Sequence, residues 1–154
     1  MTNKKIYFDM DGTIADLYGT NDWLNLLLSE SKNLFRNLKV MHDKAKLTKV
    51  MQDLQNLGYE IEVITWTPKN VSEEYIQIVA EEKKEWIAEH FPMIEKVHCV
   101  GYGIPKQNVL NTRERTQILV DDNLEVAEMW NTPKRRKSII SNENLIQNLE
   151  LLLI

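Results

Sequence analysis

The sequence predicts a single α/β domain in which a mainly parallel sheet of five strands is covered by helices. Three observations predict this class. Short β-rich runs alternate with helical patterns, which is the arrangement of parallel sheets joined by helices. Several of these runs carry consecutive apolar residues, as strands buried on both faces do. The length of 154 residues matches one domain and allows a core to form without disulfides.

The predicted elements alternate along the chain without repeats, low-complexity tracts or linkers. The strands are expected at residues 5–8, 60–65, 96–100, 117–120 and 138–140. The helices are expected at residues 43–57, 72–90 and 123–130, with a terminal helix that begins at Asn142.

The two longest predicted helices carry apolar residues at helical spacing and signals at their ends. In residues 43–57 the apolar positions recur every three or four residues, and Gly58 follows where a C-cap glycine is common. Ser72 begins the second helix as an N-cap, with two glutamates in its first turn. The apolar face of this helix is expected to comprise Ile76, Val79, Ala80, Trp86 and Ile87.

A small helical insert is expected between the first and second strands, at roughly residues 16–58. Apolar residues at positions 23, 24, 27 and 28 indicate a helix opened by Asn21 or Asp22. Those at positions 34, 35 and 38 indicate another turn or two. The insert therefore adds a small cap to the single domain rather than a second domain.

Composition excludes several classes of protein. Basic residues number 19 and acidic residues 23, so the formal net charge is −4, and 43% of the residues are apolar. These values exclude a disordered tail, a collagen-like rod and a basic nucleic-acid scaffold. The single Cys99 cannot form an internal disulfide, and neither a signal-peptide core nor a membrane span is found in the sequence. A cytoplasmic protein without membrane association is expected.

Acidic side chains follow two of the predicted strands. Asp9 and Asp11 come after the first strand, and Asp121 and Asp122 come directly after the fourth. Ligands of open parallel sheets bind beyond the carboxyl ends of the strands. Four carboxylates gathered there would repel one another unless a cation lay among them, so the sequence predicts a hard metal ion, with Mg²⁺ as the natural candidate. One cysteine and three scattered histidines offer no zinc spacing.

Four segments, in order, resemble the motifs of the haloacid dehalogenase-like (HAD) phosphohydrolase superfamily. The run Asp9-Met10-Asp11-Gly12-Thr13 after an apolar strand resembles the first motif, and the strand ending in Thr65 resembles the second. Lys106, in Gly103-Ile104-Pro105-Lys106, resembles the third, and the strand ending in Asp121-Asp122 resembles the fourth. The resemblance covers nearly the whole chain and implies a Rossmann-like three-layer sandwich with a small cap.

The resemblance also implies a role for each motif residue. Asp9 would be the nucleophile that forms an aspartyl-phosphate. Asp11 would protonate the leaving alcohol and then act as the base that activates water. Thr65, with the backbone amide after it, would hold a phosphoryl oxygen, and Lys106 would place a positive charge near Asp9.

The implied metal site draws on the same acids. Mg²⁺ would be held by the side chain of Asp9, the backbone carbonyl of Asp11 and Asp122. Asp121 would either bind the metal through water or orient Lys106. The spacing alone leaves open which of the paired acids is the direct ligand.

Several side chains near the motifs allow two interpretations. Trp66 either stacks on a substrate or packs beneath the insert. Tyr18 and Trp23 either cover the site as lid residues or belong to the core. Other lysines compete with Lys106 for the position of the third motif: Lys83, Lys84 and Lys96.

Residues 84–92 and 119–123 are similar to the 5′(3′)-deoxyribonucleotidase branch, whose members dephosphorylate nucleoside monophosphates. The expected partner is therefore a small phosphorylated substrate, a nucleotide, and not a nucleic acid or a membrane. The alternatives are a phosphatase for nucleic-acid ends or for many small phosphomonoesters, and a catalytically weak binding or regulatory protein on the same scaffold. Because all four motif acids are present, the enzyme is favoured.

Overall fold

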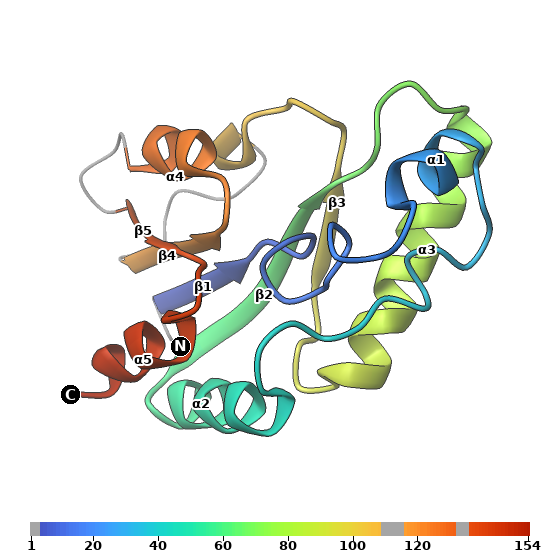
Figure 1. Cartoon of the computed structure of the whole chain (residues 1–154). Helices are drawn as coiled ribbons and strands as arrows, with labels where there is room; N and C mark the ends of the chain where they lie inside the picture. Colours follow the sequence, from blue (N-terminus) through green and yellow to red (C-terminus); the bar gives the residue numbers. More distant parts are fainter. Residues whose placement is uncertain (1–3, 109–115, 132–135) are drawn as a thin grey trace.

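Five parallel strands form one sheet in the computed structural model of the chain, which describes residues 4–108, 116–131 and 136–154 (Figure 1). The strand order is β3-β2-β1-β4-β5, so β1 lies in the middle. The predicted α/β class with a parallel five-stranded sheet is confirmed. The strands are β1 (Lys4–Phe8), β2 (Tyr59–Trp66), β3 (Val97–Val100), β4 (Thr116–Asp121) and β5 (Arg136–Ile140).

The helices begin and end close to the predicted positions. Ser72, Asp43 and Asn123 are N-caps whose side chains accept hydrogen bonds from backbone N–H groups in the first turn. The terminal helix begins at Leu145, a little later than the expected start at Asn142. None of the described helices is long and apolar enough to cross a membrane. The helices are α1 (Trp23–Leu28), α2 (Lys44–Asn56), α3 (Glu73–His90), α4 (Leu124–Trp130) and α5 (Leu145–Glu150), with short 3₁₀ turns η1 (Lys106–Asn108) and η2 (Leu151–Leu153).

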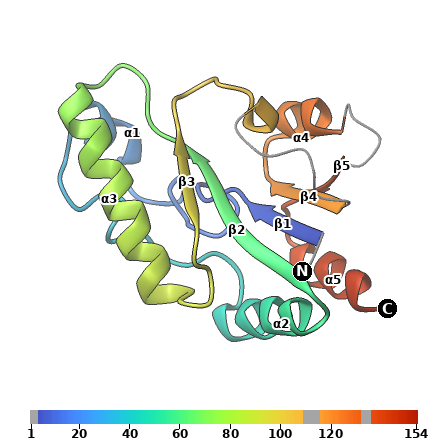
Figure 2. The same ribbon diagram turned by 180° about the vertical axis from the view of Figure 1, so that it is seen from behind.

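Apolar side chains cover the two faces of the sheet unequally. Ile6 and Phe8 of β1 point to one face, where they join a large core with residues of α2, α3, α5 and the part of the insert that precedes α2. In Figures 1 and 2, α2 and α5 lie across the sheet from α4. Tyr7 points to the other face, where it joins a smaller core with Val126 and Trp130 of α4. Side chains alternate between the faces because successive residues of a strand point in opposite directions.

The segment between β1 and β2 divides into two parts. Its second part is α2, which packs against β2 and α5 and therefore connects the two parallel strands across the sheet. Its first part carries α1 and then a series of hydrogen-bonded turns at residues 32–37. The residues that indicated a second stretch of helix form no regular helix, although all three are buried: Leu34, Phe35 and Leu38.

The buried face of α3 differs from the predicted one. Trp86, Ile87 and Val79 are buried as expected, whereas Ile76 and Ala80 are only partly buried. The helix presents Tyr75 to the insert, where its hydroxyl donates to the carbonyl of Ser31 (2.7 Å), and Tyr75 is thus buried in place of Ile76. This orientation also buries two charged residues, Glu82 and Lys83.

Glu62 is a buried carboxylate on the face of the sheet that α4 covers only in part. It forms an ion pair with Lys5 (3.1 Å) and a hydrogen bond with Nε2 of His98 (2.7 Å). Burial alone would raise the pKa of Glu62, but the hydrogen bonds from His98 and Lys5 outweigh this, and the pKa is lowered. A lowered pKa means that the ionised carboxylate stabilises the folded chain at any pH above its ordinary value, and that this contribution is lost as the pH falls through the lowered pKa.

We expect Glu62→Gln to reduce the free energy of unfolding by about 1–2 kcal/mol at neutral pH, because it removes two charged hydrogen bonds. The difference from the wild type should vanish in acid, where the wild-type carboxylate is itself protonated. Urea denaturation at a series of pH values measures both effects. Glu81→Gln is the control, since Glu81 is an exposed residue of α3 away from Lys5 and His98. A loss for Glu62→Gln that does not change with pH would contradict this account.

Candidate active site

The candidate site lies where the order of strands reverses, between β1 and β4. The two strands pair in parallel with Phe8 opposite Val120, and the N–H of Asp9 donates to the carbonyl of Val120 (2.8 Å). Asp9 therefore leaves the sheet beside Asp121 and Asp122. Ligands of open α/β sheets bind at such a point, outside the carboxyl ends of the strands.

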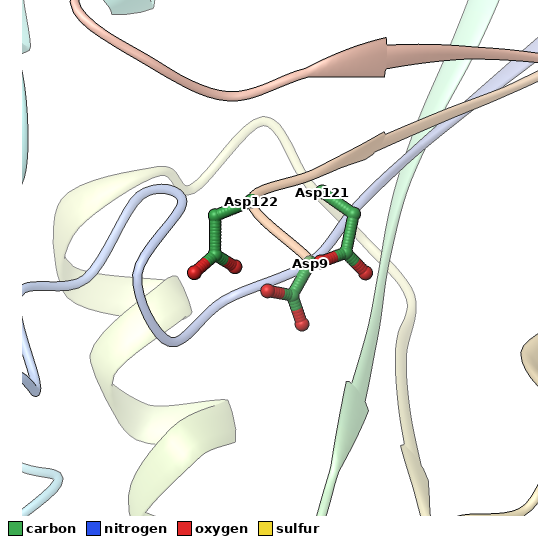
Figure 3. Close-up of side chains that lie close together, drawn as sticks. All are labelled: Asp9, Asp121 and Asp122. Carbon is green, nitrogen blue, oxygen red and sulfur yellow. The ribbon is translucent and has the colours of Figure 1, made fainter. Parts of the chain in front are cut away.

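Three carboxylates meet there. One oxygen each of Asp9, Asp121 and Asp122 lies within 4.8 Å of the others (Figure 3). Burial, and then the neighbouring Asp9 charge, raise the pKa of both Asp121 and Asp122. The cluster therefore resists carrying its full negative charge unless positive charge is brought to it.

Lys106 supplies one positive charge from the loop after β3. Its Nζ lies 2.8 Å from Asp9 Oδ1 and 2.7 Å from Asp121 Oδ2, and the side chain is buried. Burial lowers the pKa of Lys106, but the two carboxylates outweigh it, and the net pKa is raised. Three carboxylates and one ammonium group leave a formal charge of −3 + 1 = −2, which one divalent cation would neutralise.

The two acids after β4 have different surroundings. Both oxygens of Asp121 accept hydrogen bonds, one from Lys106 and the other from the N–H of Asn123 (2.9 Å). Asp122 is more exposed, and Thr13 Oγ1 lies 3.3 Å from one of its oxygens. Asp122 is thus the better placed of the two to bind a metal directly.

Thr13 links the two strand ends. Its hydroxyl is fully buried, lies within hydrogen-bond distance of Asp9 Oδ2 (3.2 Å) and Asp122 Oδ1 (3.3 Å), and accepts a bond from the N–H of Asp122 (3.1 Å). One hydroxyl proton can serve only one carboxylate at a time. The first motif predicts no role for Thr13, because its contacts arise only where β1 packs against β4.

Lys83 of α3 brings a second buried ammonium group to the site. Its Nζ lies 2.8 Å from Asp11 Oδ2, 2.7 Å from Thr65 Oγ1 and 2.9 Å from the carbonyl of Trp66. The sequence marked Lys83 only as a rival of Lys106, yet both lysines reach the site. The spacing could have predicted that Lys83 is buried, because it falls four residues after Val79 and three before Trp86, on the buried face of its helix.

Asp11 lies beside the carboxylate cluster and not within it. Its side chain pairs with Lys83, and its Oδ1 is buried with no hydrogen-bond partner among the described residues. Burial raises the pKa of Asp11, and the ion pair with Lys83 offsets this only in part. A carboxyl group with a raised pKa is suited to donate a proton and then accept one.

A cavity of about 370 Å³ opens from these residues toward the insert. Its floor holds the charged groups, and its walls come from α1, from the segment after β2 and from the loop after β3. The walls are largely apolar or aromatic, which is the usual lining of a small-molecule site. They include Leu17, Tyr18, Trp23, Leu27, Phe35, Trp66, Pro68 and Tyr102.

Trp66 lies at one wall of this cavity. Its Nε1 donates to the carbonyl of Ile104 (2.8 Å), and its ring packs at 5.1 Å from the ring of Tyr102. Tyr18, which is 54% exposed, also lines the cavity and packs edge-on against Trp23. All four rings therefore line the cavity, and those of Trp23 and Trp66 also pack against the core.

Gly12 allows the turn between β1 and the insert. Its φ is +81°, and a Cβ at this position would lie 2.4 Å from Asp122 Oδ2 and 2.8 Å from a ring carbon of Tyr18. The chain must therefore lack a side chain here for Asp122 to stay in the carboxylate cluster.

Gly12→Ala is expected to cost about 1 kcal/mol of stability through its positive φ, and also to displace Asp122 from the carboxylate cluster, which would weaken the binding of a divalent cation there. Urea denaturation and a Mg²⁺ titration by calorimetry measure the two effects. Gly58→Ala is the matched control, because Gly58 has a positive φ at the end of α2, away from the carboxylates. Equal metal affinity in the two variants would show that the side chain at position 12 does not disturb the cluster.

Comparisons with known proteins support the fold. No protein-family model matches the sequence, and no curated protein matches it. Among solved structures, the chain is similar to the crystal structure of D,D-heptose 1,7-bisphosphate phosphatase from Burkholderia thailandensis. The TM-score is 0.54 with 11% sequence identity, and the match covers 97% of this chain and 98% of that chain. At this identity the likeness shows a shared α/β fold over nearly the whole length.

Proposed function

We propose that the chain is a Mg²⁺-dependent phosphomonoester hydrolase that acts through an aspartyl-phosphate on Asp9, with nucleoside or deoxynucleoside monophosphates as substrates. The observation that carries this proposal is the set of contacts of Lys106, which joins Asp9 and Asp121 beside Asp122 at the strand switch point. The shared fold with a phosphatase and the four motifs of the HAD-like superfamily add support.

The proposed reaction has two steps. A carboxylate oxygen of Asp9 attacks the phosphorus, the bond from phosphorus to the leaving oxygen breaks, and the protonated Asp11 gives its proton to that oxygen. The free alcohol departs and leaves the phosphoryl group on Asp9. Asp11, now ionised, takes a proton from water as the water oxygen attacks the phosphorus, which releases phosphate and regenerates Asp9.

The two buried lysines have different proposed tasks. Lys106 holds Asp9 in place and lowers the repulsion between its carboxylate and the phosphate. Lys83 holds both Asp11 and Thr65, so it orients the proton donor together with the hydroxyl that would bind a phosphoryl oxygen. These contacts fix the reacting groups before the substrate arrives.

The donor set fits a divalent cation. Oxygen ligands alone, and a net formal charge of −2 with Lys106 counted, suit Mg²⁺ held by Asp9, Asp122 and the backbone carbonyl of Asp11. When bound, the cation supplies positive charge that offsets the negative charge of the phosphate.

The walls of the cavity support a substrate with a flat leaving group. A base or similar ring would find aromatic surfaces at Trp66 and Tyr102, within reach of a phosphate placed at Asp9. A sugar would place only the C–H groups of one ring face on these surfaces, which is a smaller contact than a planar base makes. These walls therefore support nucleotides as the proposed substrate class.

Asp9→Asn is expected to reduce turnover of p-nitrophenyl phosphate by about 10³-fold or more, because an amide cannot form the intermediate. EDTA should reduce wild-type turnover to background, and added Mg²⁺ should restore it. Asp53→Asn is the control, since Asp53 pairs with Lys49 on the outside of α2. A wild type that is inert with Mg²⁺ across nucleotides and sugar phosphates, or that is equally active with EDTA, would refute the proposal.

Trp66→Ala is expected to raise KM for nucleoside monophosphates by about tenfold, because stacking on one aromatic ring is lost. KM for methyl phosphate should change less than about twofold, because this substrate has no ring to stack on Trp66. Steady-state kinetics with 5′- and 3′-monophosphates, sugar phosphates and methyl phosphate test this. An equal change for all substrates would mean that Trp66 only packs, and a clear preference for sugar phosphates would refute the nucleotide assignment.

A further inference from the structure

Glu82 is a buried carboxylate that the proposed reaction does not use. Its side chain accepts three hydrogen bonds from the backbone of the insert: from the N–H of Asn33 (2.9 Å), of Phe35 (3.1 Å) and of Arg36 (3.2 Å). The residue is only 7% exposed. A carboxylate this buried is costly unless hydrogen bonds replace its water, and here backbone N–H groups do so.

The loop that Glu82 holds has no regular helix of its own. It turns through Asn33, whose φ is +68°, and then presents successive N–H groups to the carboxylate. Glu82 is thus the centre around which residues 33–36 are wrapped.

The same loop forms part of the cavity wall. Phe35 is buried, lines the cavity, and places its ring 5.0 Å from Nζ of Lys83. Lys83 follows Glu82 in the sequence and holds Asp11 and Thr65. Two adjacent residues of α3 therefore hold the insert and the proton donor.

Other contacts join the insert to α3 on both sides of Glu82. The hydroxyl of Tyr75 donates to the carbonyl of Ser31 (2.7 Å), and Nε1 of Trp86 donates to the carbonyl of Leu38 (2.8 Å). In Figures 1 and 2 the chain between α1 and α2 runs along α3. The insert segment 31–38 is therefore bonded to α3 over several turns, with Glu82 in the middle.

We propose that Glu82 is a positioning residue that fixes segment 31–38 as a rigid wall of the cavity, and that it thereby sets which leaving groups the enzyme accepts. The selectivity part rests on the proposed function, whereas the rigidity part does not. Because the wall is bonded to the helix that carries Lys83, the shape of the cavity is set before substrate binds. Leaving groups that reach Phe35 depend on Glu82, and leaving groups too small to reach it do not.

The test compares Glu82→Gln with Glu81→Gln, an exposed neighbour on the same helix. The amide that replaces the Glu82 carboxylate keeps one acceptor oxygen but turns an NH₂ group toward one of the backbone donors. We expect hydrogen exchange at residues 33–36 to become about tenfold faster or more in Glu82→Gln, and to stay unchanged in Glu81→Gln. KM for nucleoside monophosphates should rise several-fold at constant kcat, while both constants for methyl phosphate stay unchanged.

Each outcome decides the proposal. Unchanged exchange at residues 33–36 would overturn it, as would equal kinetic losses for nucleotides and methyl phosphate. If the wild type hydrolyses neither substrate, the proposed function fails, and the exchange measurement still decides whether Glu82 fixes the wall. If Glu82→Gln does not fold, Glu82→Asp takes its place, because its shorter side chain keeps the charge and reaches fewer of the three donors.

Discussion

Charge balance at one edge of the sheet is the constraint on which the site depends. Asp9, Asp121 and Asp122 lie within 4.8 Å of one another, and burial there raises the pKa of the last two. Without a positive charge nearby, the three carboxylates would repel one another or remain partly protonated. Lys106 neutralises only one of the three charges, and the proposed divalent cation would neutralise the other two.

The fold brings these groups together because its strands are parallel. The carboxyl ends of β1 and β4 lie side by side, so Asp9 and the paired acids, more than 100 residues apart in the chain, become neighbours. The positive charges come from elements beyond this pair: Lys106 from the loop after β3, and Lys83 from the helix after β2. The insert covers the charged residues at this edge of the sheet and encloses a cavity, which has a polar floor and apolar walls.

Features that depend on neighbouring residues in the chain could be predicted from the sequence. Short apolar runs predicted the strands, and their alternation with helices predicted that the strands are parallel. The structure confirms this fold, with the acids placed directly after the strands. The conformation of residues 33–36 was not predictable in this way, because it depends on Glu82, which lies more than 45 residues away. The prediction of the buried face of α3 was partly wrong for a related reason. Two charged residues of this helix, Glu82 and Lys83, are buried by partners that the apolar pattern does not reveal.

The chemical roles of the site residues remain predictions, and the central one is that a divalent cation joins Asp9 to Asp122. The most direct measurement is anomalous diffraction from crystals soaked in Mn²⁺, which takes the same octahedral oxygen sites as Mg²⁺. The account predicts a single strong peak in contact with carboxylate oxygens of both residues. The account would be contradicted if crystals soaked at saturating Mn²⁺ showed no ordered ion at this edge of the sheet. It would also be contradicted if the ion bound elsewhere while these carboxylates contacted only protein.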